Sequence, residues 1–200
     1  MKTKKKAKIE NVVIIALSVI ILVLSVLLIV PMFSDEDESA RVIDRIQIER
    51  RFLVDFNNIP WDGLGTGVDI LQSYISLNPE IRLRNTDGSN FTFLLRTPID
   101  EAGLSRQDIE FEISKEEYDE LFQKISGIVV HKTRFRLSHE GQNIRVDIFL
   151  GELNSLVLAE VVFDSIEDAE AYEPLEWFGE EVTEDLRYRN AALSMYGLPK

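Results

Sequence analysis

Basic side chains recur at every second position in two segments of the sequence. Arg82 and Arg84 are spaced in this way, and so are Lys132, Arg134 and Arg136. Because alternate residues of a β-strand share one face, each set would present its positive charges together. Arginine and lysine bind phosphate oxygens, so this pattern favours a site for a phosphorylated anion.

Acidic side chains share such faces with the basic ones. Glu49 lies two residues before Arg51, and Asp147 lies two residues after Arg145. Mg²⁺ is usually held by one or two carboxylates together with substrate phosphates. The cations on ionic faces are Arg51, Arg82, Arg84, Arg96, Lys132, Arg134, Arg136 and Arg145, and the anions are Glu49, Glu110, Glu112, Asp147 and Glu160. A local excess of positive charge with some carboxylates suits a polyanion that carries a bound metal ion.

The same spacing has a plainer interpretation. Charged faces also occur on the solvated side of antiparallel sheets, where cross-strand ion pairs contribute little to stability. If instead the apolar faces pack on helices and the sheet closes, the charged faces line an interior. Spacing alone leaves both possibilities open.

The elements that would position these residues are mostly strands, which predicts a mainly β member of the α+β class. Alternation or turn residues predict strands at 46–54, 81–85, 91–97, 107–114, 128–137, 143–150 and 155–163, with a hairpin turn at Thr86-Asp87-Gly88. Helices are expected at Val68–Ser76, which carries Tyr74, after a capping box that begins at Ser114, at Ser165–Tyr172 and at Thr183–Met195.

Composition excludes several classes of function. The net charge is −13, and from residue 11 onward 34 acidic and 17 basic residues give −17. So acidic a domain is a poor general binder of nucleic acid. Cysteine is absent, and the histidines His131 and His139 do not form a zinc-protease motif. We interpret His131 as a packed or surface residue because it falls on the face opposite Lys132.

The N-terminal region predicts a membrane anchor. Residues 1–11 form a basic tail, residues 12–30 an apolar stretch of transmembrane length, and residues 31–42 an acidic linker. The positive charge before the stretch predicts a cytoplasmic N-terminus and a domain outside the cytoplasm. The expected partners are therefore a lipid bilayer through residues 12–30 and a phosphorylated ligand, with no nucleic acid.

Residues 43–199 resemble the CYTH domains, also called triphosphate tunnel metalloenzymes. Their signature strand reads E-x-E-x-K, and the segment QIERR at 47–51 looks like a version of it with two substitutions. Further similar segments are IRLR, DIEFEIS, KTRFRL, VDIFLG, LAEVVF and WFGEEVTEDLRYRNAAL, in the same order. The resemblance implies an eight-stranded antiparallel β-barrel that forms a tunnel, with helices packed outside.

The resemblance also implies an activity and a role for each matching residue. Such enzymes hydrolyse inorganic, nucleoside or thiamine triphosphate with Mg²⁺ or Mn²⁺, whereas other branches make cyclic AMP. The implied phosphate-binding residues are Arg51, Arg82, Arg84, Arg96, Lys132, Arg134 and Arg136. The implied acidic set, which would hold metal or orient the bases, is Glu49, Glu110, Glu112, Asp147 and Glu160. Tyr74 and Lys132 match the pair that helps to activate the attacking water.

Two departures leave a second function open. Gln47 stands where the signature has its first glutamate, and Val162 stands where a second glutamate is expected after Glu160. Two negative charges are therefore missing from the acidic set, and metal affinity should fall. We expect a triphosphatase, with a weakened module that binds polyphosphate or nucleotide as the alternative. An adenylyl cyclase has no distinguishing feature in this sequence.

Overall fold

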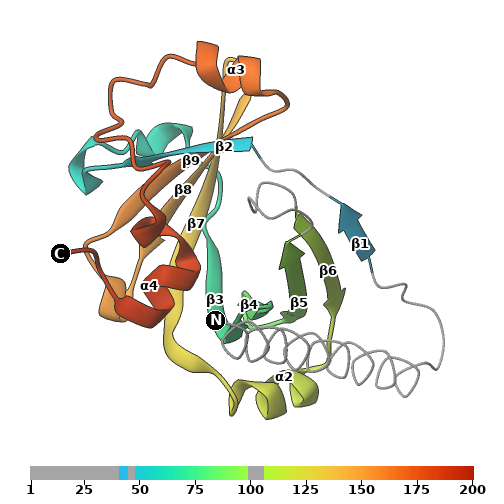
Figure 1. Ribbon diagram of the computed structural model, residues 1–200. Coiled ribbons are helices and arrows are strands. Elements are labelled where there is room, and N and C mark those ends of the chain that lie inside the picture. The colour runs from blue at the N-terminus through green and yellow to red at the C-terminus, as the bar shows by residue number, and fades with distance from the viewer. Residues whose placement is uncertain (1–40, 45–47, 99–105) are drawn as a thin grey trace, which may run out of the picture. The chain divides into compact units, whose positions relative to one another are not determined.

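The computed structural model describes residues 41–44, 48–98 and 106–200, and its main element is one antiparallel sheet. Nine strands follow the order β1-β6-β5-β4-β3-β7-β8-β9-β2 (Figure 1). The strands are β1 (Arg41–Asp44), β2 (Ile48–Leu53), β3 (Val68–Leu77), β4 (Glu80–Thr86), β5 (Asn90–Pro98), β6 (Arg106–Glu112), β7 (Ser126–His139), β8 (Gln142–Phe149) and β9 (Val157–Phe163). The helices are α2 (Lys115–Phe122), α3 (Ile166–Ala171) and α4 (Asn190–Tyr196), and short 3-10 turns span Phe56–Asn58, Trp61–Gly63, Gly151–Leu153 and Leu186–Tyr188.

The predicted transmembrane segment, 12–30, lies outside the described residues, as does Gln47. Within the described ranges, every helix is too short or too polar to cross a membrane.

The sheet is open, which corrects the expected closed barrel of eight strands. Its edge strands β1 and β2 are consecutive in the chain, and among the described strands β1 pairs only with β6 and β2 only with β9. A closed barrel would require one strand to pair with neighbours on both of its sides. Here residues 41–44 form one edge strand of the sheet and residues 48–53 form the other. The ninth strand, β1, begins at Arg41, inside the segment expected to be a linker.

The prediction of a helix at Val68–Ser76 is wrong, because this segment is the central strand β3. It pairs with β4 on one side and with β7 on the other. Apolar residues at Val68, Leu71 and Ile75 imitate the three-to-four-residue spacing of an amphipathic helix. Pairing on both sides decides in favour of a strand. The hairpin at Asp87 and the capping box at Ser114 are confirmed.

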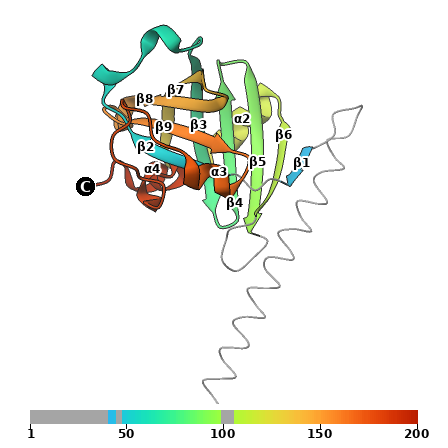
Figure 2. The same cartoon turned by 90° about the horizontal axis from the view of Figure 1, so that it is seen from above.

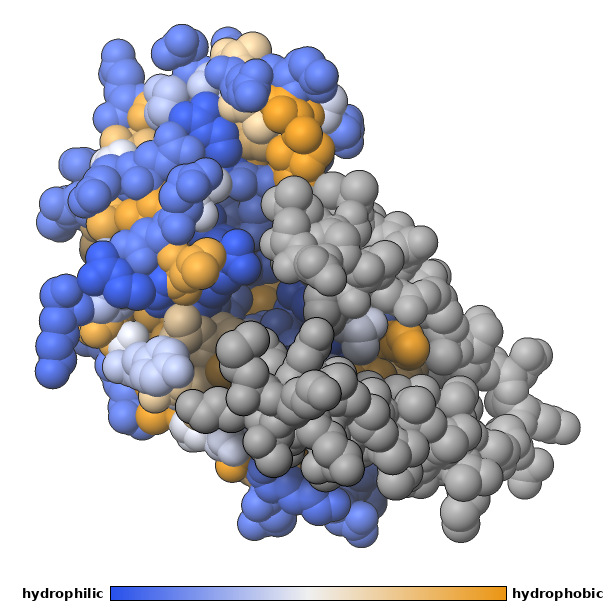
Figure 3. All heavy atoms as spheres, in the orientation of Figure 1, coloured by the Kyte–Doolittle hydropathy of each residue, from blue (hydrophilic) through white to orange (hydrophobic). Residues whose placement is uncertain are grey.

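The sheet is strongly curved, so that its strands form two walls. We call β7, β8, β9 and β2 the first wall, and β3, β4, β5 and β6 the second wall (Figure 1). Seen from above, the strands of the first wall run across the direction of those of the second (Figure 2). Figure 3 shows that hydrophilic residues prevail over the visible described surface, as the excess of acidic residues leads one to expect.

Apolar packing on the outer face keeps this curvature in place. On the first wall, Phe52, Val146 and Val161 are buried under the segments around Leu64 and Phe178. On the second wall, Leu83 and Phe91 are covered by helix α2, whose Tyr118 is 5% exposed. Burying an aromatic or aliphatic side chain contributes about 1.5–3 kcal/mol, so the outer face supplies much of the folding energy. The inner face is thereby left for polar groups.

Helix α4 is an exception to the expectation that helices pack outside. Its Leu193 joins a cluster with Val130 and Leu158, which lie on the same sheet face as Lys132 and Asp147. Ser194 Oγ also donates a hydrogen bond of 2.6 Å to the carbonyl of Ile128. Helix α4 therefore covers one end of the inner face.

Candidate functional site

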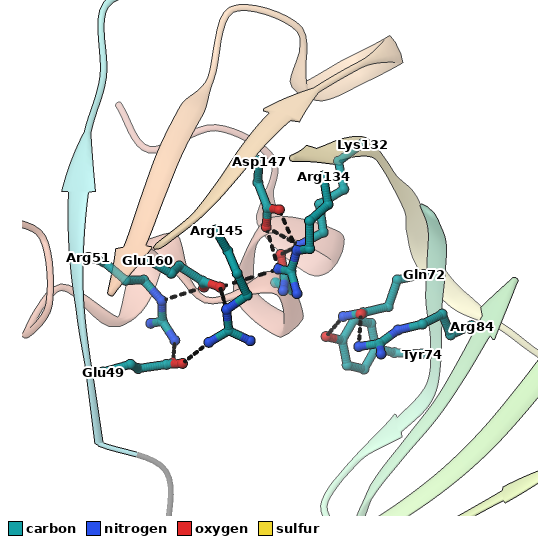
Figure 4. Close-up of polar contacts among 11 residues, drawn as sticks. Glu49, Arg51, Gln72, Tyr74, Arg84, Lys132, Arg134, Arg145, Asp147 and Glu160 are labelled. Atoms are coloured by element: carbon teal, nitrogen blue, oxygen red, sulfur yellow. Dashed lines mark hydrogen bonds and ion pairs between the residues drawn. The ribbon is translucent and has the colours of Figure 1, made fainter. Parts of the chain in front are cut away.

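Four charged side chains at the edge of the first wall form a closed ring. Arg51 on β2 donates from Nε to Glu160 on β9 at 2.9 Å and also pairs with its strand neighbour Glu49. Arg145 on β8 donates to Glu49 at 3.1 Å, and its Nε lies 3.6 Å from Glu160 (Figure 4). Each carboxylate therefore contacts both guanidinium groups. The alternation of β2 places Glu49 and Arg51 on one face, as the sequence predicted.

Deeper on the same wall, one carboxylate holds two cations. Asp147 accepts hydrogen bonds from Lys132 Nζ at 2.5 Å and from Arg134 Nε and Nη2 at 2.6 Å each. The burial of Asp147 would raise its pKa, but the charges of Lys132 and Arg134 outweigh this and hold it well below its usual range. Arg134 also reaches Glu160 at 3.2 Å, which connects this group to the ring. Asp147 is thus ionised and fixes the direction of two cations.

Lys132 is more enclosed than a surface lysine. Its side chain is 2% exposed, and its Nζ lies 5.2 Å from the centre of the Phe149 ring. Asn190, the first residue of α4, accepts a weak hydrogen bond from the same nitrogen at 3.4 Å. Burial lowers the pKa of Lys132 to about 8, although Asp147 opposes the shift. Lys132 therefore holds its proton less tightly than an ordinary lysine.

The second wall contributes a polar chain of three side chains, of which Gln72 and Tyr74 are buried. Gln72 and Tyr74, both on β3, are 1% and 2% exposed. Arg84 on β4 donates from Nη2 to Gln72 Oε1 at 3.1 Å, and Gln72 Nε2 donates to the Tyr74 hydroxyl at 2.5 Å. Burial raises the pKa of Tyr74 to about 12, so its hydroxyl keeps its proton at physiological pH. Figure 4 shows these side chains pointing toward the same space as those of the first wall.

Arg84 differs from its neighbours because its charge is not neutralised. Among the described residues, no carboxylate lies within 4 Å of its guanidinium, and its buried Nε lacks a hydrogen-bond partner. Burial, together with the charges of Arg82 and Arg134, lowers the pKa of Arg84 to about 10. Arg134 belongs to the opposite wall, so cations from the two walls repel each other across the space between them. A polyanion bound there would relieve that repulsion.

Comparison with known proteins places this chain in a family. No protein-family model matches it. An inorganic triphosphatase of Nitrosomonas europaea is 40% identical over 153 residues, which cover 74% of this chain and 97% of that protein. An inorganic triphosphatase of Acetivibrio thermocellus is 33% identical over 150 residues, which cover 74% of this chain and 92% of the relative. The chain belongs to the CYTH family.

A solved structure agrees with this assignment. The crystal structure of an inorganic triphosphatase matches with a TM-score of 0.60 at 34% identity, covering 81% of this chain and all of that one. The family suggested by the sequence is therefore confirmed, and the triphosphatase class is the one that both curated relatives carry by name.

The remaining predicted residues of this CYTH chain are spread along both walls. On the second wall, Arg96 pairs with Asp108 at 2.5 Å and with Glu80 at 3.7 Å, and Arg82 lies 3.7 Å from Glu110. Glu112 is exposed at the surface of β6 and accepts a hydrogen bond from Asn90 at 2.7 Å.

A pocket of about 430 Å³ opens at the end of the first wall. Arg136 is exposed and lines it, together with Arg145 and Val162. Val162 pairs with Asn143 and with Glu49 in the sheet, so its side chain lies on the ionic face, as the sequence predicted. An apolar residue therefore stands beside the ring at the position where the family resemblance implies an acid.

The acidic residues suit a divalent ion that arrives with its phosphate ligand. The described residues contain no ready cluster of three or more acidic, histidine or cysteine ligands. However, Glu49 and Glu160 converge on the same two arginines, and two carboxylates with substrate phosphates suffice for Mg²⁺. Asp147 is less suited because its oxygens already accept three hydrogen bonds.

Sequence reasoning missed two polar contributors, Gln72 and Asn190. Gln72 lies in the segment expected to be a helix, so its neighbours could not be assigned. If the segment is taken as a strand, the position of Gln72 two residues before Tyr74 indicates that the two side chains share a face. Asn190 lies 58 residues from Lys132 in the chain, and no local pattern connects the two.

His131 was expected not to be part of the site. Its Nε2 lies 2.8 Å from Asp69 Oδ1, and its side chain is 37% exposed. It stands on the face opposite Lys132, as the alternation of β7 predicted.

Proposed function

We propose that this chain hydrolyses inorganic tripolyphosphate, which it binds between the two walls of its curved sheet. The observation that carries the proposal is the half-buried Arg84, a positive charge with no carboxylate within 4 Å among the described residues, facing the cations of the other wall. Leaving a charge unneutralised in a folded protein is costly. A ligand with several negative charges would remove that cost. The names of the two curated relatives support the same reaction.

Charge-assisted contacts from both walls would hold the substrate. Arg84 and Arg82 have buried Nε atoms that lack hydrogen-bond partners among the described residues. Asp147 and Glu160 accept the hydrogen bonds of Arg134 Nε and Nη2, which leaves the two N–H bonds of Nη1 for an oxygen in the space between the walls. Arg51 and Arg96 would neutralise charge at the two ends, and Arg136 would do so at the open pocket. Such preorganised donors stabilise the charge that develops during phosphoryl transfer.

Lys132 is our candidate for the group that accepts a proton from the attacking water. Its pKa of about 8 leaves a useful neutral fraction near physiological pH. The water oxygen would bond to the terminal phosphorus as the bridging P–O bond breaks, releasing phosphate and diphosphate. Tyr74 remains protonated, so we assign it a hydrogen-bond donor's role instead of that of a base.

A divalent ion, Mg²⁺ or Mn²⁺, would be held by Glu49 and Glu160 together with phosphate oxygens. Bound there, it would neutralise phosphate charge and polarise the phosphoryl group. The missing acid at Val162 should weaken its binding.

Phosphate release by the full-length chain tests the proposal. Tripolyphosphate, ATP and thiamine triphosphate would be offered in turn with Mg²⁺, with Mn²⁺ and with a chelator. We expect metal-dependent release, fastest from tripolyphosphate. If no substrate is hydrolysed but tripolyphosphate raises the melting temperature, as a ligand of the native state must, the chain is a binding module and the enzymatic proposal is wrong.

The site of action is part of the proposal. The apolar residues 12–30 support an anchor in the membrane, with the catalytic domain outside the cytoplasm. Protease added to intact cells should then degrade the domain, and a protected domain would reverse the proposed orientation.

A further inference from the structure

The buried side-chain amide of Gln72 forms hydrogen bonds with two described side chains, Arg84 and Tyr74, and so connects them. It lies on the central strand, 1% exposed, and both of its polar atoms are used. A guanidinium group can only donate hydrogen bonds, so the amide atom that faces Arg84 must be the oxygen. The NH₂ group therefore faces Tyr74, and the orientation of the amide is chemically determined.

This orientation determines what the tyrosine can do. An amide NH₂ group only donates, so the Tyr74 oxygen is the acceptor in their 2.5 Å contact. The phenolic hydrogen must then point to a different acceptor. Among the described residues, none accepts a hydrogen bond from this hydroxyl, and Figure 4 shows Tyr74 in the space between the walls.

We propose that Gln72 is a positioning residue, which directs the O–H bond of Tyr74 at a phosphate oxygen of the substrate. The inference rests on the proposed function, because the acceptor is the bound triphosphate. Arg84 takes part through its contact with the amide oxygen, which prevents the amide from turning over. The uncharged amide thereby acts on the anion through one donor, the Tyr74 hydroxyl.

The alternative is that Gln72 only fills space in the sheet. A double-mutant cycle separates the two roles, because a residue that acts through Tyr74 has little left to do when the hydroxyl is gone. Gln72→Met keeps the side-chain length but removes both hydrogen bonds, and Tyr74→Phe removes only the hydroxyl. The matched control is Ser73→Ala on the same strand. Ser73 is 0% exposed, but it pairs with Leu83 on the face covered by α2.

The experiment measures kcat/KM for tripolyphosphate with Mg²⁺, and the Kd of tripolyphosphate in a chelator, on the full-length chain. We expect Gln72→Met and Tyr74→Phe each to lower kcat/KM about tenfold, the size of one charge-assisted hydrogen bond. The double variant should also lose only about tenfold. Ser73→Ala should keep its kcat/KM within twofold, and melting temperatures control for folding.

Three outcomes would overturn the inference. If the losses multiply to about a hundredfold in the double variant, Gln72 acts independently of Tyr74. If Gln72→Met changes kcat/KM and Kd less than twofold while the wild-type chain is active, the alignment is unimportant and the proposed function survives. If the wild-type chain neither binds nor hydrolyses tripolyphosphate, both proposals fail together.

Discussion

Arg84 and Arg134 provide the sharpest comparison, because they are partly buried cations of opposite walls with different surroundings. Arg134 forms two hydrogen bonds with Asp147, whereas among the described residues Arg84 forms a hydrogen bond only with the neutral Gln72. We predict that Arg84→Met abolishes most of the activity without loss of stability, and that Arg134→Met destabilises the fold. The two variants remove the same charge and add the same side chain.

The expected magnitudes follow from the structure. The pKa of about 10 for Arg84 means that burial and the nearby charges of Arg82 and Arg134 together disfavour its charged form by about 3 kcal/mol. Replacing it with an apolar side chain relieves this cost and loses one hydrogen bond of about 1–2 kcal/mol, so stability should be unchanged or slightly higher. Removing Arg134 leaves the buried Asp147 undercompensated, which costs about 3–5 kcal/mol. For a domain of this size 1 kcal/mol corresponds to about 2–4 °C, so the melting temperature should fall by about 10 °C.

The assays are thermal unfolding monitored by circular dichroism and phosphate release at saturating Mg²⁺. Loss of Arg84 should lower kcat/KM for tripolyphosphate by about 10- to 100-fold, the range for one or more charge-assisted hydrogen bonds. Arg84→Met protein that melts as early as the Arg134→Met variant would show that Arg84 has a stabilising acid partner. Full activity of Arg84→Met would show that the substrate does not bind in the space between the walls.

Three further predictions concern other parts of the chain. With Lys132 as the proton acceptor, kcat should rise as pH increases through about 8, where the neutral form appears, and Lys132→Met should remove this limb of a kcat-pH profile. Val162→Glu restores a carboxylate beside Arg145, so half-maximal activity should need less Mg²⁺, and an unchanged metal titration would argue against a metal role for this position. Arg50 donates to Glu181 and to two carbonyl groups on the outer face. Arg50→Met should therefore lower the free energy of unfolding in urea by about 1–3 kcal/mol and leave kcat unaltered. A parallel loss of kcat would mean that the outer face influences the site.

The sequence by itself determined which residues share a face. Strand alternation has a period of two and needs no distant partner, so spacing alone groups Glu49 with Arg51 and Arg82 with Arg84. The capping box at Ser114 is readable for the same reason, since its partners lie three residues apart. The family resemblance supplied the triphosphatase class, which the curated relatives support.

The tertiary structure decided which of these groups meet and which remain unpaired. Strand register brings Asp147 opposite Arg134, and sheet curvature sets Arg84 against the cations of the other wall. The segment containing Gln72 has apolar spacing that suits a helix, and only pairing with β4 and β7 makes it a strand. These outcomes depend on contacts between residues far apart in the chain, and local spacing carries no information about them.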